Sequence, residues 1–236
     1  MNFNFSLFNE NTAKLGLSFT DETISKLDAF AGMLIEANKH MNLTAITSPE
    51  DIAVKHFADS LSPLAFVNMN DGDRVIDVGT GAGFPGVPLL IANPAINLAL
   101  LDSTAKKLDF IASSLSTLGL SAETLHMRAE DAGHKDDMRG SFDYVFSRAV
   151  APLNILCEYC LPLVRPGGKF IAMKGSKADE EIKDAYVALK TLGGAVSAKH
   201  NFELTDGERC IIIIDKLSET PKKYPRASAQ ISKKPL

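Results

Sequence analysis

The chain has 236 residues, of which 45% are hydrophobic and 23% are charged, and its formal net charge is −4. These values are ordinary for a globular protein of one or two domains. The sequence contains no apolar run of the roughly eighteen residues that a membrane-spanning helix needs, and Met1 to Phe5 lack a basic secretory signal start. Its three cysteines provide no disulfide framework. We therefore expect a cytoplasmic protein.

Residues 1–70 read as an N-terminal helical extension. Thr20 can cap one helix, and Ser48 followed by Pro49 begins a second one that Pro63 ends. Within this second helix, Lys55 and Asp59 are spaced as an ion pair on a solvated face. His56 between them is more typical of a structural histidine than of a catalyst.

From residue 72 strands and helices alternate, a pattern typical of a parallel sheet with helices on both faces. Strands are expected at 74–78, 97–101, 122–127, 142–147 and 168–173, with helices near 86–92, 104–118, 152–164 and 178–192. Two further strands, 195–203 and 208–216, then form a hairpin. We expect a Rossmann-like α/β fold over 71–217, with a mostly parallel seven-stranded sheet that ends in this antiparallel hairpin.

Residues 218–236 form a basic tail. From residue 216 onward, six Lys or Arg side chains stand against the single acid Glu219. The Pro, Ser and Lys content predicts disorder, while the local positive potential favours contact with a polyanion. Deleting 218–236 should therefore weaken contact with such a polyanion and leave the affinity for any small ligand of the sheet domain unchanged.

The loop after the first strand carries glycines at every second position, Gly79, Gly81 and Gly83. Such a loop lets the backbone approach a ligand closely. It matches the G-x-G-x-x-G pattern of dinucleotide-binding proteins, with an acid about twenty residues on at Asp102. It also matches S-adenosylmethionine (SAM) methyltransferases, which we favour because Asp77 would repel a pyrophosphate but suits a sulfonium. A tight turn without a ligand is the remaining interpretation.

Each later strand end offers one candidate residue, and these ends meet at one edge of a parallel sheet. Asp102 is placed to accept both ribose hydroxyls of a nucleoside, or merely to cap the next helix. Ala129 and Glu130 follow the third strand, where an adenine would lie. Arg148 ends the fourth strand and is suited to a carboxylate or phosphate, or to a salt bridge with Asp143 or Glu158. Lys174 ends the fifth strand.

Metal and nucleophile signals are weak. The pair Cys157 and Cys160 stands alone inside an apolar helix, which favours buried thiols over zinc. The five histidines show no ligand spacing, and no serine lies in a nucleophile-elbow motif. We therefore expect no metal and name no catalytic acid or base.

Several segments outside the glycine loop are more specific than the loop itself. They are His40–Ile46, Lys55–Ser60, Leu101–Ser103, Arg128–Glu130, Ser147–Ala149, Ala172–Gly175 and Thr220–Arg226. With these segments the chain closely resembles the bacterial RsmG (GidB) family of ribosomal RNA methyltransferases over nearly its whole length. Lys-His-x-x-Asp-Ser together with Ser-Arg-Ala is typical of this family.

The resemblance implies methylation of N7 of a guanine in 16S ribosomal RNA or the small ribosomal subunit, with SAM as cofactor and a monomeric enzyme. We expect the cofactor at the following positions: Gly79, Gly81, Phe84, Asp102, Ala129, Glu130 and Arg148. For the RNA we name Lys174, Lys222 and Lys223. The roles of His56, Asp59 and Ser60 stay open. The alternatives are an NAD-dependent oxidoreductase and a non-catalytic RNA-binding protein.

Overall fold

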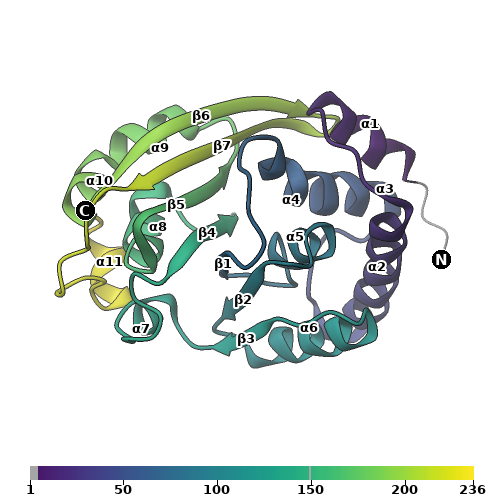
Figure 1. Ribbon diagram of the computed structural model, residues 1–236, viewed down its shortest axis with the longest axis horizontal. Helices are drawn as coiled ribbons and strands as arrows, with labels where there is room; N and C mark the ends of the chain where they lie inside the picture. The colour runs from purple at the N-terminus through teal and green to yellow at the C-terminus, as the bar shows by residue number, and fades with distance from the viewer. Residues whose placement is uncertain (1–4, 149) are drawn as a thin grey trace.

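A seven-stranded sheet in the order β3-β2-β1-β4-β5-β7-β6 forms the centre of the computed structural model, which describes residues 5–148 and 150–236 (Figure 1). The strands are β1 (Arg74–Val78), β2 (Asn97–Asp102), β3 (Glu123–His126), β4 (Phe142–Arg148), β5 (Val164–Lys174), β6 (Gly194–Leu204) and β7 (Gly207–Lys216). The first five pair in parallel, and β7 runs antiparallel to both β5 and β6. The predicted Rossmann-like fold with its antiparallel hairpin is therefore confirmed.

Alternate strand residues face two separate hydrophobic cores, which explains why β1 and β2 read as continuous apolar runs. Val75 contributes to one core and Ile76 to the other. Figure 1 shows α2 (Asp21–Met41), α5 (Gly86–Ala92) and α6 (Ala105–Thr117) on one face, and α8 (Leu153–Cys160) and α10 (Tyr186–Leu192) on the opposite face. The remaining sheet-domain helices are α7 (Ala129–Ala132) and α9 (Ala178–Asp184).

Two predicted helices differ in extent from the observed ones. The helix expected over 152–164 ends at Cys160, because Pro162 offers no backbone N–H and β5 starts at Val164. The helix expected over 178–192 is divided into α9 and α10 at Ala185.

The N-terminal extension is helical as predicted, but it does not have a core of its own. Its elements are α1 (Ser6–Lys14), α2, α3 (Pro49–Asp51), a π-helix η1 (Ile52–Ala58), α4 (Asp59–Leu61) and a 3-10 turn η2 (Ser62–Ala65). The Thr20 and Ser48 hydroxyls accept from the amides of Thr23 and Asp51, as their capping roles require. Phe30 of α2 packs against Phe84 and Phe110 of the sheet domain.

The prediction of a disordered tail is wrong. Residues after β7 include α11 (Ser228–Lys233), and Tyr224 and Ile231 are buried. The Arg226 guanidinium pairs with the fully buried Glu158 carboxylate at 2.6 Å. Composition alone suggested disorder, but two apolar anchors and this ion pair with a distant helix order the segment.

Across the described residues, no helix combines the length and the apolarity that crossing a membrane would require. The described part of the chain also contains no group of three or more His, Cys, Asp or Glu side chains placed to hold a metal ion. Cys157 and Cys160 are buried free thiols, and burial raises the pKa of both.

Candidate active site

The glycine loop lies at the carboxyl end of β1, where β1 is flanked by β2 on one side and β4 on the other. At such a point the crossovers diverge to opposite faces and leave a crevice. Gly79, Gly81 and Gly83 all adopt positive φ, at 75°, 59° and 99°. A side chain is strained in this conformation, so the geometry explains all three glycines.

Asp77 fixes both ends of this loop. Its Oδ2 accepts from the Thr80 hydroxyl at 2.7 Å and from the Gly86 amide at 2.9 Å. Its Oδ1 is buried and has no hydrogen-bond partner in the described structure. Burial is the main reason that the pKa of Asp77 is raised to about 6, and the bonds from Thr80 and Gly86 oppose it. Asp77 is fully buried and lines none of the cavities described below, so it holds the loop from inside the protein.

Asp102 also contacts the loop directly. Its Oδ2 accepts from the Gly81 amide at 2.9 Å, and its Oδ1 accepts from the Thr104 amide at 2.8 Å just before α6. The carboxylate therefore supports both the loop and the helix start. Each oxygen keeps a second lone pair for a ligand hydroxyl.

A cavity of about 480 Å³ opens beside this carboxylate, and we call it the Asp102 cavity. It brings together Gly79, Gly81, Ala129 and Glu130, which the sequence placed at a cofactor site. Its wall also includes Lys107 of α6, Tyr159 of α8, and Ser228 and Ser232 of α11. The tail thus lines the same cavity as these predicted cofactor positions.

Arg148 connects the sheet to the N-terminal extension. Its Nη1 donates to the Lys55 carbonyl at 2.8 Å and to Asp59 Oδ2 at 2.9 Å, and its Nη2 donates to His56 Nδ1 at 3.2 Å. The predicted alternatives, Asp143 and Glu158, are not its partners, because they pair with Arg165 and Arg226.

His56 is neutral and fixed in one tautomer. Because a guanidinium only donates, His56 Nδ1 accepts and its Nε2–H donates to Thr44 Oγ1 at 2.9 Å. The ring stacks on Phe84 at 4.1 Å between centroids and 5° between planes. Burial, and secondarily the Arg148 charge, lower the pKa of His56 to about 3. These contacts agree with the prediction that His56 is a structural histidine and not a catalyst.

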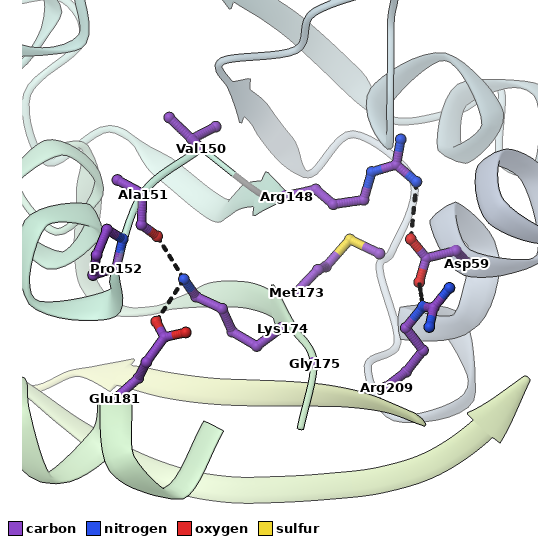
Figure 2. A pocket seen from close by; sticks show the side chains of 10 residues that line it. All are labelled: Asp59, Arg148, Val150, Ala151, Pro152, Met173, Lys174, Gly175, Glu181 and Arg209. Carbon is purple, nitrogen blue, oxygen red and sulfur yellow. Dashed lines mark hydrogen bonds and ion pairs between the residues drawn. The ribbon is translucent and has the colours of Figure 1, made fainter. Parts of the chain in front are cut away.

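Asp59 lies between two arginines, as Figure 2 shows. Besides Arg148, it accepts from Arg209 Nε of β7 at 3.1 Å, and its residue is only 8% exposed. The predicted pairing of Asp59 with Lys55 is wrong, because Lys55 pairs with Asp51 at 2.7 Å. The π-helix η1 directly precedes Asp59, and such turns are frequent at functional sites.

Two further cavities adjoin Arg148. The His56 cavity, of about 400 Å³, lies between the glycine loop and the N-terminal extension, and Phe84, His56, Asp59 and Arg209 line it. The Arg209 cavity, of about 430 Å³, is the one drawn in Figure 2. Its lining residues are Asp59, Arg148, Val150, Ala151, Pro152, Met173, Lys174, Gly175, Glu181 and Arg209.

The predicted RNA lysines lie in different surroundings. The Lys174 ammonium donates to the Ala151 carbonyl at 2.6 Å and pairs with Glu181 at 2.7 Å, and its side chain is 6% exposed (Figure 2). Lys222 and Lys223 are exposed and line none of the three cavities.

Val150 lies where the cavities meet. It lines both the Asp102 and the Arg209 cavities, and a Cβ built on Gly79 would lie only 2.6 Å from its Cγ2. The positive φ of Gly79 is what favours glycine there, because the exposed Val150 side chain can move away from an added Cβ. Ala149, the last residue of the Ser-Arg-Ala motif, lies outside the described residues.

These residues fit SAM. Its adenosine needs acceptors for two ribose hydroxyls, and the Asp102 cavity offers the carboxylates of Asp102 and Glu130 on its wall. Its amino-acid end carries a carboxylate, which suits the guanidinium of Arg148 in the two cavities that adjoin it. When bound, the cofactor supplies an electrophilic methyl group on its sulfonium.

The sheet order and the glycine loop define a Rossmann-like methyltransferase. A SAM-dependent O-methyltransferase from Thermotoga maritima has the same fold, with a TM-score of 0.53 at 17% identity over 80% of this chain and 72% of that one. TYW2 from M. jannaschii, solved in complex with AdoMet, gives a TM-score of 0.50 at 11% identity over 61% and 68%.

Sequence similarity identifies a particular family within this fold class. The family profile described as rRNA small subunit methyltransferase G matches residues 23–210. The protein of that name from Pelotomaculum thermopropionicum is 44% identical over 230 residues, 96% of each chain, and that from Alkaliphilus oremlandii is 44% identical over 233 residues, 98% of each. This chain belongs to the rRNA small subunit methyltransferase G family, and its cofactor is SAM. The predicted resemblance is confirmed, and NAD is not the cofactor.

Sequence reasoning missed several residues of the site. Arg209 lies in the hairpin, and Tyr159 and Glu181 lie within helices, so no strand-end rule identifies them. For His56 and Asp59 a signal existed, because they form part of the family motif, but their roles needed the position of Arg148.

Proposed function

We propose that this protein transfers the methyl group of SAM to N7 of a guanine in 16S ribosomal RNA. The substrate is the RNA or the small ribosomal subunit, and the enzyme acts as a monomer in the cytoplasm. The cofactor residues of this proposal are Gly79, Gly81, Phe84, Asp102, Ala129, Glu130 and Arg148. The observation that carries it is the Arg209 cavity, which shares Val150 and Ala151 with the Asp102 cavity.

The target guanine occupies the Arg209 cavity. In duplex RNA, N7 faces a deep, narrow groove that side chains do not enter, so the base comes from a loop or is splayed out. Asp59 and Glu181 on the cavity wall are acceptors that match the N–H groups of a guanine. They also stabilise the positive charge that the purine gains on methylation.

The reaction needs no general base. Guanine N7 presents a lone pair in the ring plane and carries no proton, so an in-line approach to the methyl group suffices. The ionisable groups around the cavity agree with this. Asp59 lies between two arginines, Glu181 pairs with Lys174, and the His56 Nδ1 lone pair accepts from Arg148. The two carboxylates are held in ion pairs, and the lone pair of His56 is already used by Arg148, so none of the three is placed to take a proton from the base.

The test uses small subunits from cells that lack the endogenous activity. After incubation with the enzyme and SAM, the 16S RNA is digested and its modified nucleosides are identified by mass spectrometry. We expect 7-methylguanosine at one site, and a methyl group on another atom or base would refute the proposal. A rate that rises with pH between about 6 and 9 as a single group loses its proton would argue for a base after all.

Arg209 gives a matched pair of variants. Arg209→Met removes a charge from the target-base cavity, and Arg165→Met removes one from an ion pair that lines none of the three cavities. We expect Arg209→Met to lower kcat/KM for the RNA by about a hundredfold, the scale of a lost charge-assisted contact. SAM affinity should change little. Equal losses in both variants would show a general effect of charge.

A further inference from the structure

The C-terminal helix α11 lines the Asp102 cavity although it lies more than a hundred residues after the glycine loop in the chain. Ser228 and Ser232 are on its wall, together with Tyr159 of α8. The Tyr159 and Ser228 hydroxyls are hydrogen-bonded at 3.0 Å, so α8 and α11 meet at the cavity itself. Asp102 and Glu130 line the same cavity.

An ion pair holds the segment before α11 against α8. Glu158 Oε1 accepts from both the backbone N and the Nε of Arg226 at 2.8 Å, and Oε2 accepts from Nη2 at 2.6 Å. The Glu158 side chain is fully buried, and Arg226 Nη1 also donates to the Lys234 carbonyl at the end of α11. Glu158 is adjacent in sequence to Tyr159. One turn of α8 therefore anchors the tail and lines the cavity.

Arg139 fixes the approach to this segment. Its guanidinium donates to the carbonyls of Thr220, Pro221 and Tyr224 in the tail and to that of Gly133 after α7. Tyr224 itself is buried in the core beside α8. The path of the chain into α11 is thus set by several contacts and not by the Arg226 pair alone.

We propose that residues 224–232 form the outer wall of the adenosine subsite, and that Glu158 and Arg226 are positioning residues for cofactor binding. This inference rests on the cofactor placement proposed above. A bidentate, buried pair of this kind fixes geometry, and a wall held in place before binding lowers the ordering cost of association. Loss of the wall should weaken the cofactor without touching the glycine loop.

The direct test fills the cavity from α11. Ser232 is exposed and lines the cavity, whereas Gln230 is exposed on the same helix and does not. Ser232→Phe should weaken SAM by about tenfold or more in calorimetric titration because the ring occupies the cofactor's space, and Gln230→Phe should bind as the wild type does. Wild-type affinity in Ser232→Phe, or equal loss in both, would overturn the inference.

A second test removes the anchor without leaving a buried charge. The double variant Glu158→Leu/Arg226→Leu replaces both partners with apolar groups of similar size, which proteins often tolerate. Its control, Lys169→Leu/Asp215→Leu, removes an ion pair between β5 and β7 that lines none of the cavities. We expect about tenfold weaker binding of SAM and of methylthioadenosine in the first variant only. Unchanged binding of both ligands would refute the positioning role.

Asp102→Ala separates this inference from the site assignment. If Asp102→Ala weakens SAM and Ser232→Phe does not, the adenosine subsite is placed correctly and the role of α11 is wrong. If neither variant changes the affinity, the cofactor lies elsewhere and the placement on which the inference rests fails with it.

Discussion

Two buried ionisable side chains near the glycine loop have pKa values displaced in opposite directions by the same cause. Burial disfavours the charged form of each, which lowers the pKa of His56 from 6.5 to about 3 and raises that of Asp77 from 3.8 to about 6. Neutral His56 can accept from Arg148, which a protonated imidazole could not do. The geometry of Arg148 therefore depends on the protonation of His56.

The consequence is a specific dependence of stability on pH. Between about pH 3 and 6.5 the unfolded chain binds a proton at His56 that the folded chain does not, so His56 makes stability fall as the pH falls, by up to about 1.4 kcal/mol per pH unit. Asp77 acts in the opposite sense between 3.8 and about 6, because there the folded form binds the extra proton.

His56→Gln should remove only the first contribution, because the amide still bonds to Arg148 and Thr44 but does not titrate. The free energy of unfolding, measured with urea from pH 7.5 to 4.5, should then fall less on acidification than in the wild type. Parallel pH profiles of the two proteins would mean that His56 is already neutral in the unfolded chain or protonated in the folded one.

At the scale of elements, the sequence predicts the helix starts and strands that depend on neighbouring residues in the chain. Thr20 and Ser48 begin helices through their own hydroxyls, and the alternation after residue 72 gives every strand within a few residues. The order of the tail is not a local property. It depends on a partner distant in sequence, the buried Glu158, so composition misjudged the tail.

The tail lysines are tested by charge reversal, because deleting 218–236 would also strip Tyr224 from the core and leave Glu158 buried without its cation. Lys222→Glu/Lys223→Glu should weaken binding to 16S RNA and reduce the slope of log affinity against log salt by about two units, one per lost phosphate contact. SAM affinity should stay unchanged. Lys183→Glu/Lys190→Glu, exposed on α9 and α10, is the control with the same change in net charge. An equal slope in wild type and tail variant would place the RNA elsewhere.

At the scale of the molecule, the site is assembled from both ends of the chain. The strand-end residues were predictable because parallel strands bring their carboxyl ends to one edge. Arg209 from the hairpin reaches the His56 cavity, and Ser228 from α11 reaches the Asp102 cavity, only through the tertiary fold. No local sequence pattern predicts either position. The N-terminal extension contributes His56 and Asp59 to the wall of the His56 cavity, so it forms part of the candidate site.

The shared aromatic cluster should make the extension and the sheet domain unfold together. Phe30 of α2 is fully buried, and its ring centroid lies 5.6 Å from that of Phe84, which follows the glycine loop, and 6.0 Å from that of Phe110 of α6. Phe30→Ala should lower the free energy of unfolding by about 3–5 kcal/mol, the usual cost of emptying such a site, and calorimetry should still show one transition. Tyr186→Ala, at a position that is 66% exposed, should cost less than about 0.5 kcal/mol.

SAM affinity should fall in Phe30→Ala as well, because Phe84 loses the ring that supports its stack on His56. Two separate transitions, with only the first shifted, would show that residues 1–70 fold as an independent unit.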